Sequence, residues 1–137
     1  MKREIKFRAW QPQVKRMFEV GDIDFIKEEV MLCHWGWESS NDIDLMQYAG
    51  REDNNKRKIY EGDIVSFGSV WDNGDNEDLD EEIHIGVVEY DPHYAVYDVN
   101  CEESGERRFL FIDVVNYDGF GVIGNVFENP ELLEAKQ

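Results

Sequence analysis

Few residues in this chain have the types and spacing that metal binding or nucleophilic catalysis requires. Its cysteines and histidines are Cys33, His34, His84, His93 and Cys101. They include no Cys-x-x-Cys or His-x-x-x-His pair, although structural zinc sites normally use such close pairs. Cys33 and His34 are adjacent, so on a strand they would point to opposite faces and could not work as nucleophile and base. We therefore expect no catalytic residue, no metal site, no cofactor and no enzymatic activity.

A glycine pattern near the C-terminus has the letters of a dinucleotide-binding motif without its context. Residues 119–124 read Gly-x-Gly-x-x-Gly. In the dinucleotide motif these glycines open a helix whose first turn binds the pyrophosphate. Here they are interspersed with and followed by β-forming residues, so the sequence does not predict a nucleotide site.

Carboxylates are the dominant charged groups, and they are concentrated in one segment. The chain has 14 Lys and Arg against 31 Asp and Glu, a formal net charge of −17. Residues 59–106 contain 15 of these acids and no lysine or arginine. This acidity argues against direct nucleic-acid binding, because phosphate contacts need basic side chains. Seven acids lie within residues 72–82, namely Asp72, Asp75, Glu77, Asp78, Asp80, Glu81 and Glu82.

We interpret residues 72–82 as a loop, because runs of like charge repel one another and stay solvated. Three roles remain open for this loop: a solvated hairpin tip, a surface that binds a basic protein, or a loose cation site. A calcium loop requires glycine at its sixth position, and the sixth residue counted from Asp75 is Asp80.

The other candidate binding residues are Trp35 and Trp37. They are two positions apart, so on a strand their side chains would share one face. Such a pair belongs either to a core or oligomer interface, where aromatic residues are enriched, or to a stacking platform for a ligand.

The N-terminal part predicts short strands. Ile5, Phe7 and Ala9 alternate with polar or larger residues, which is the pattern of a half-buried strand, and residues 17–20 form the returning strand of a hairpin. Residues 28–33 fit a strand or a short helix, and we favour the strand. Residues 45–49 form another short apolar run, and residues 51–58 are polar and predict an exposed loop.

Further strands are predicted in the central and C-terminal part, at residues 64–71, 83–90, 94–97, 107–112 and 121–127. Gly62 can adopt a positive φ and Asp63 can accept bonds from nearby amides, so the two form a structural turn before the first of these strands. Asn129 and Pro130 are expected to cap a short helix over residues 130–136.

These elements predict a mainly β fold (a β-rich α+β protein). We expect an SH3-like small barrel with an added N-terminal β-hairpin and a short C-terminal helix. The chain is short enough for a single domain over residues 1–137. Within it, residues 1–58 hold the hairpin and a connecting segment, and residues 59–137 hold the barrel-like part, the acidic loop and the helix. No apolar run is long enough to span a membrane, and we expect a cytoplasmic location with no export signal.

Three stretches together resemble the YopX family of phage and prophage proteins. They are residues 3–10 (REIKFRAW) with 15–17 (KRM), residues 45–50 (LMQYAG) with 59–65 (IYEGDIV), and residues 122–133 (VIGNVFENPELL). The family's usual GLKDKNGK loop reads GREDNNKR here, so Lys56 replaces a glycine. The resemblance implies a phage- or prophage-encoded protein of a bacterial cytoplasm that self-associates. It implies no reaction and no catalytic residues.

Together these observations predict a non-enzymatic interaction protein whose acidic surface engages a basic host or phage protein. The alternative is an oligomeric structural or small-ligand-binding accessory module with an aromatic interface. We expect a homo-oligomer that binds neither nucleic acid directly nor a membrane.

Overall fold

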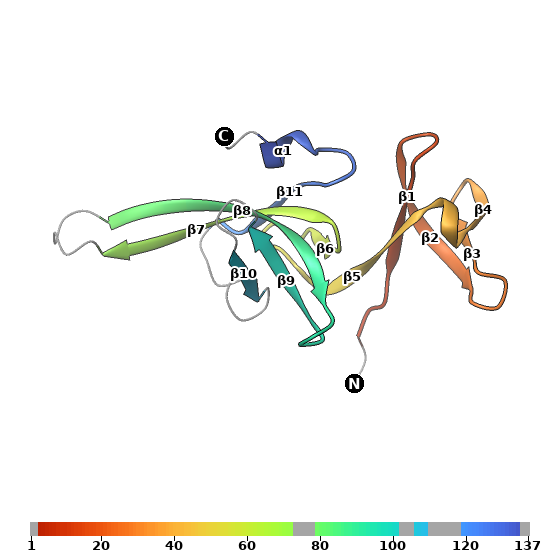
Figure 1. Ribbon diagram of the computed structural model, residues 1–137, viewed down its shortest axis with the longest axis horizontal. Coiled ribbons are helices and arrows are strands. Elements are labelled where there is room, and N and C mark those ends of the chain that lie inside the picture. The colour runs from red at the N-terminus through yellow and green to blue at the C-terminus, as the bar shows by residue number, and fades with distance from the viewer. Residues whose placement is uncertain (1–2, 73–78, 102–105, 110–118, 135–137) are drawn as a thin grey trace. The chain divides into compact units, whose positions relative to one another are not determined.

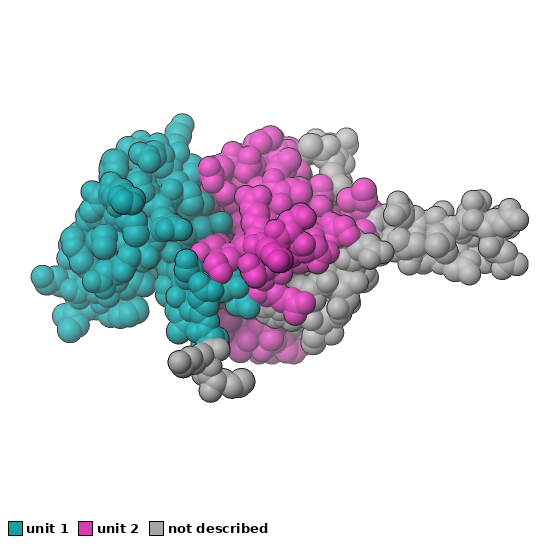
Figure 2. Space-filling model, turned by 180° about the vertical axis from the view of Figure 1, so that it is seen from behind, with its two compact units in different colours: residues 1–50 teal, residues 51–137 magenta. Residues whose placement is uncertain are grey.

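The computed structural model describes residues 3–72, 79–101, 106–109 and 119–134. The chain forms two compact units, Met1–Gly50 and Arg51–Gln137, which are shown in teal and magenta in Figure 2. Almost all of the regular structure in both units is antiparallel β-sheet, so the predicted mainly β class is confirmed.

Unit 1 is an antiparallel sheet in which most neighbouring strands are also neighbours in sequence. Its order is β4-β3-β2-β1-β5, and β5 continues past Gly50 to pair with β6. A short 3-10 helix, η1, precedes β5. The bounds are β1 Phe7–Gln11, β2 Arg16–Asp24, β3 Glu29–Leu32, β4 Gly36–Ser39, η1 Ser40–Asp42 and β5 Asp44–Glu52. The predicted β1–β2 hairpin is therefore confirmed, and residues 28–33 contain a strand.

The core of unit 1 lies on one face of this sheet. Ala9 pairs with Phe18 across β1 and β2, and Val20 pairs with Leu32 across β2 and β3. Directly opposite residues of an antiparallel pair share a face, so alternate positions meet in one layer. The buried cluster consists of Ala9, Phe18, Val30, Leu32 and Ile43.

Unit 2 contains a five-stranded antiparallel sheet in the order β10-β9-β8-β7-β11. The bounds in this unit are β6 Lys58–Tyr60, β7 Asp63–Asp72, β8 Leu79–Asp91, β9 Val96–Cys101, β10 Glu106–Phe109, β11 Gly121–Asn125 and α1 Glu131–Glu134. Figure 1 shows β7 and β8 as the longest strands of the chain. Ile64, Val65, Phe67, Val88 and Val99 are almost completely buried. No ladder joins β10 to β11 within the described residues, so the sheet is not seen to close into the expected barrel.

Some predicted segments differ from the structure in their bounds. The strand expected at residues 94–97 is β9, Val96–Cys101, and Tyr94 and Ala95 lie in the turn before it. The prediction of an exposed loop over residues 51–58 is wrong at both ends of that segment, because β5 extends to Glu52 and β6 begins at Lys58. Backbone pairing stabilises these polar residues as strands, although their side chains give no apolar alternation. The helix α1 covers Glu131–Glu134, and residues 135 and 136 of the expected helix lie outside the described part. In that part, no helix is long and apolar enough to cross a membrane.

Candidate functional site

The acidic segment lies on a two-stranded ribbon. β7 and β8 pair continuously from Ile64 opposite Val87 to Asp72 opposite Leu79. β11 pairs with β7 only up to Ser66, and β9 pairs with β8 only from Val87 onward. Beyond these points the two strands pair only with each other in the described part of the chain. We call residues 67–72 and 79–86 the acidic ribbon (Figure 1).

The prediction of a loop over residues 72–82 is wrong at its ends. Asp72 is the last residue of β7, and Asp80, Glu81 and Glu82 lie within β8. They are strand residues because the opposite strand supplies β-forming residues, including Val70 and Trp71, and pairing with those residues sets the local structure. Asp75, Glu77 and Asp78 lie outside the described residues.

The base of the acidic ribbon is held by the predicted turn at Gly62 and Asp63. Gly62 has a φ of 83°, a conformation that glycine adopts without steric penalty. Its N–H donates to the carbonyl of Val88, and its own carbonyl accepts from Val126. The buried Asp63 carboxylate accepts a 2.8 Å bond from the N–H of Tyr60. Gly62 and Asp63 thus form a turn directly before β7, which begins at Asp63.

A ring pair marks where the acidic ribbon meets the core. Phe67 lies opposite His84 in the ladder, and their rings stack with centroids 5.2 Å apart. Phe67 is almost completely buried. The ribbon is thus fixed at its base, while the acidic residues follow toward its far end.

The structure does not bring Trp35 and Trp37 onto one face. Trp35 lies in the turn after His34, whose φ is 64°, and its ring packs 5.3 Å from that of Phe18. Trp37 lies opposite Met31 in the β3–β4 ladder, on the face away from the core. Trp35 and Trp37 are 45% and 50% exposed, so neither is buried in the core of unit 1. A role in an oligomer interface or in ligand stacking stays a prediction.

The expected helix cap at Asn129 and Pro130 has a different arrangement. Asn129 Oδ1 accepts a bond from the backbone N–H of Asn125, at the end of β11. The Asn125 side chain in turn accepts from the N–H groups of Phe127 and Glu128. These bonds fold the chain back on itself after β11. The backbone carbonyls of Asn129 and Pro130 accept the first bonds of α1.

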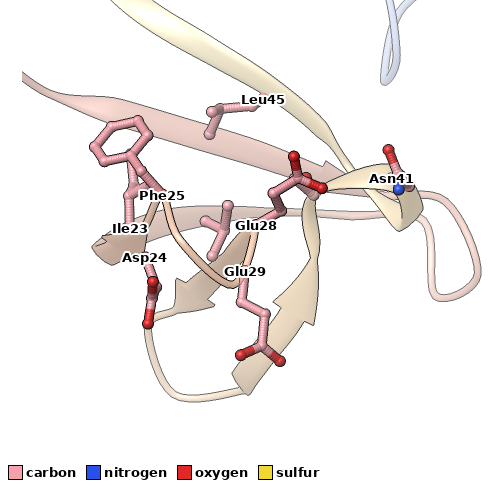
Figure 3. A pocket seen from close by; sticks show the side chains of 9 residues that line it. Ile23, Asp24, Phe25, Glu28, Glu29, Asn41 and Leu45 are labelled. Carbon is pink, nitrogen blue, oxygen red and sulfur yellow. The ribbon is translucent and has the colours of Figure 1, made fainter.

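A cavity of about 260 Å³ opens on unit 1 and was not anticipated from the sequence. It lies on the core side of the sheet, between the β2–β3 turn, η1 and the start of β5. Its apolar lining comes from Ile23, Phe25, Val30 and Leu45, and its polar lining comes from Asp24, Glu28, Glu29, Ser40 and Asn41. In Figure 3 the Glu28 carboxylate lies on the side of Leu45 and Phe25, and the carboxylates of Asp24 and Glu29 lie on the opposite side.

A comparison of the sequence with protein families identifies the family. The sequence model described as YopX protein matches residues 6–134. The chain belongs to the YopX family. The resemblance seen in three separate stretches is confirmed over almost the whole chain.

A solved structure shares the fold of this YopX chain. It is the crystal structure of protein EF1440 from Enterococcus faecalis, which has 22% sequence identity and a TM-score of 0.62. The match covers 96% of this chain and 99% of that one. No curated protein matches the sequence of the YopX chain.

A buried carboxylate of the YopX chain was also missed by the sequence reasoning. Asp53 is only 6% exposed. Its Oδ1 accepts from the N–H groups of Asn55 and Arg57 at 2.8 and 2.9 Å, and its Oδ2 accepts from Val122 at 2.9 Å. Asp53 therefore shapes its own turn and ties it to β11. Lys56 in this turn has a φ of 65°, a conformation that glycine adopts without steric penalty.

The cysteines and histidines of the YopX chain belong to different elements, except for the adjacent Cys33 and His34, and His84 lies in β8. Cys33 and His34 occupy the β3–β4 turn, Cys101 is buried at the end of β9, and His93 lies in the β8–β9 turn. Among the described residues, no group of three or more His, Cys, Asp or Glu side chains is placed to hold a metal ion.

Proposed function

We propose that this YopX-family chain is a non-enzymatic interaction protein that binds a basic protein through the acidic ribbon. The observation that supports it is the register of β7 and β8, which carries the acidic segment beyond the last pairing with β9 and β11. In the described part of the chain no further strand pairs with the acidic ribbon, so that part leaves both edges of the ribbon accessible to a partner.

The spacing of the charges strengthens this proposal. An antiparallel strand rises about 3.4 Å per residue, so the backbone positions of Asp72, Asp80, Glu81 and Glu82 lie within about 10 Å along the ribbon. This length is about one Debye length at 0.1 M salt, so a basic partner experiences the four acids as one cluster. Residues 59–106 contain no lysine or arginine that would offset the negative charge of this cluster.

The cellular setting is part of the same proposal. The family resemblance supports a phage- or prophage-encoded protein in a bacterial cytoplasm, whose partner is a basic host or phage protein. Cys33 and Cys101 are free thiols, which suits a reducing compartment.

The experiment compares two variants with equal net charge. The first carries Asn or Gln at the seven acids of residues 72–82. The second neutralises seven exposed acids elsewhere, namely Glu4, Glu19, Asp22, Asp44, Glu52, Glu131 and Glu134. Each variant has a net charge of −10, from −17 + 7. Both are used as baits in lysate of the bacterial host at about 0.05 M and about 0.5 M salt. Partners are identified by mass spectrometry, purified and titrated directly.

We expect a basic protein that binds the unmodified chain and the second variant but not the first. Its association should slow as salt rises, because complementary charges act mainly on the rate of encounter. Equal binding to both variants would show that the acidic ribbon is only a solvated tip. Recovery of the chain without any basic partner would refute the proposal.

A second function is favoured by the exposed tryptophans. Trp35 and Trp37 are each about half exposed, and large apolar side chains at a surface often form interfaces. We propose self-association through this aromatic surface as the alternative, in an oligomeric structural or small-ligand-binding module. Light scattering should then show a mass above that of one chain, and replacing Trp37 by Ser should lower it. A monomer at micromolar concentration would remove the support for this alternative.

A further inference from the structure

We propose that the cavity of unit 1 binds a basic peptide segment of a partner protein, which inserts one large apolar side chain between β2, η1 and β5. This surface is distinct from the acidic ribbon of unit 2. The inference does not rest on the function proposed for that ribbon.

The apolar floor of the cavity is formed by residues that belong to the core of unit 1 or pack against it. Val30 belongs to the buried core cluster, and Ile23, its cross-strand partner, packs against that cluster. Leu45 lies opposite Ala9 of the same cluster and is 40% exposed. An apolar side chain placed here would extend the existing core, and burying its surface is favourable by roughly 25 cal/mol per Å².

The β2–β3 turn presents its apolar residues to solvent. Phe25 and Ile26 are 82% and 95% exposed. The turn is fixed by Asp24, whose Oδ1 accepts from the N–H groups of Ile26 and Lys27 at 3.0 Å. Two adjacent large apolar residues held at a turn beside an apolar cavity are typical of an interaction site.

The charges around the cavity select the occupant. Asp24, Glu28 and Glu29 line it, and no lysine or arginine does. Among the described residues, the side chains of Glu28 and Glu29 have no hydrogen-bond or ion-pair partner. The Glu28 carboxylate lies on the side of Leu45 and Phe25 (Figure 3), where it complements a Lys or Arg next to the inserted apolar residue.

The size of the cavity favours a peptide over a larger ligand. Pockets that enclose drug-sized molecules have volumes of roughly 300–1,000 Å³, whereas this cavity has about 260 Å³. It suits a single large side chain, with the flanking residues of the peptide on the surface. Ser40 and Asn41 supply hydrogen-bonding groups at the same rim.

The test uses two matched synthetic peptides and the full chain. The first peptide is Lys-Lys-Ser-Leu-Ser-Lys-Lys, and the second replaces its leucine by serine, which leaves the charge unchanged. Each is titrated to about 1 mM, the range of weak peptide binding, at about 0.15 M salt. Amide resonances are followed by NMR. We expect the leucine peptide alone to shift the amides of Ile23, Val30 and Asn41.

Two double variants separate local from general charge effects. Glu28→Gln with Glu29→Gln should weaken the affinity for the leucine peptide by about two- to thirty-fold, which is the range expected for the loss of two exposed ion pairs. The control, Glu19→Gln with Asp22→Asn, removes two exposed acids that do not line the cavity. It should change the affinity by less than about two-fold.

Several results would overturn the inference. Equal binding to both double variants would exclude recognition by the rim of the cavity. Shifts confined to the acidic ribbon with both peptides would assign the binding to unit 2, and the absence of any shift would exclude the site. Shifts of the same amides on dilution of the protein alone would identify a second copy of the chain as the occupant.

Discussion

Replacing Asp53 by alanine should destabilise unit 2 strongly, although the residue lies in a polar turn. Its carboxylate accepts three backbone hydrogen bonds, from Asn55, Arg57 and Val122. Asn55 and Arg57 are exposed, so water can replace Asp53 as the acceptor for their N–H groups. The bond to Val122 is buried, and its donor would have no such replacement.

The expected loss of folding free energy is the sum of the contributions of the three hydrogen bonds to Asp53. A hydrogen bond to a charged group contributes about 1.5–3 kcal/mol, whereas a bond that water can replace contributes about 0.5–1.5 kcal/mol. We expect the free energy of unfolding to fall by about 3–5 kcal/mol in the alanine variant. Asp53→Asn keeps one acceptor oxygen and should lose about 1.5–3 kcal/mol. These are large fractions of a domain stability of about 5–15 kcal/mol.

The assay is urea unfolding followed by circular dichroism, together with hydrogen exchange of the Val122 amide. The matched control is Glu52→Ala, which removes the adjacent, exposed carboxylate and should change the stability by less than about 0.5 kcal/mol. Exchange at Val122 should accelerate more than about ten-fold in Asp53→Ala, since about 1.4 kcal/mol corresponds to a factor of ten. Equal urea midpoints for the two alanine variants would refute this reasoning, as would an unchanged exchange rate at Val122.

Two further substitutions test backbone geometry in unit 2 by urea unfolding. Gly86→Ala would place a Cβ 2.5 Å from Val99 Cγ1 and should lower the free energy of unfolding by about 1–3 kcal/mol. In the control, Gly21→Ala, the new Cβ meets the flexible end of Met31 at 2.8 Å, so the loss of stability should be smaller. An equal loss of stability in the two variants would contradict the packing argument. Lys56→Gly should stabilise by about 0.5–1 kcal/mol, because Lys56 has a φ of 65°. Asn54→Gly, in the same turn without a positive φ, should give no gain, and a gain there as large as that of Lys56→Gly would contradict the reasoning.

Local patterns in the sequence predict those elements whose conformation is set by residues close to one another in the chain. The alternation through Phe7 and Ala9 predicted β1, because one side of that strand faces the core. Gly62 and Asp63 predicted their turn, because a positive φ and a carboxylate that accepts from nearby amides act within four residues. The mainly β class followed from many such short segments.

The features missed from the sequence depend on residues far away in the chain. Asp53 is buried because its carboxylate binds Val122, which is 69 positions later. The cavity combines the β2–β3 turn with η1 and Leu45, and the alternation within a single strand contains no sign of this arrangement. The two-residue spacing of Trp35 and Trp37 predicts one shared strand face, but the positive φ of His34 marks a turn that ends β3 before Trp35.

The bond between Asp53 and Val122 also affects the order of events during synthesis. Ribosomes add about 5–20 residues per second, so Asp53 is made roughly 3–14 s before the N–H group that it binds. During that interval β7 lacks β11, its neighbour on one side, and presents an open edge to other chains. The sheet of unit 2 is thus complete only when β11 has left the ribosome, and a nascent chain that stops before Val122 is prone to aggregate.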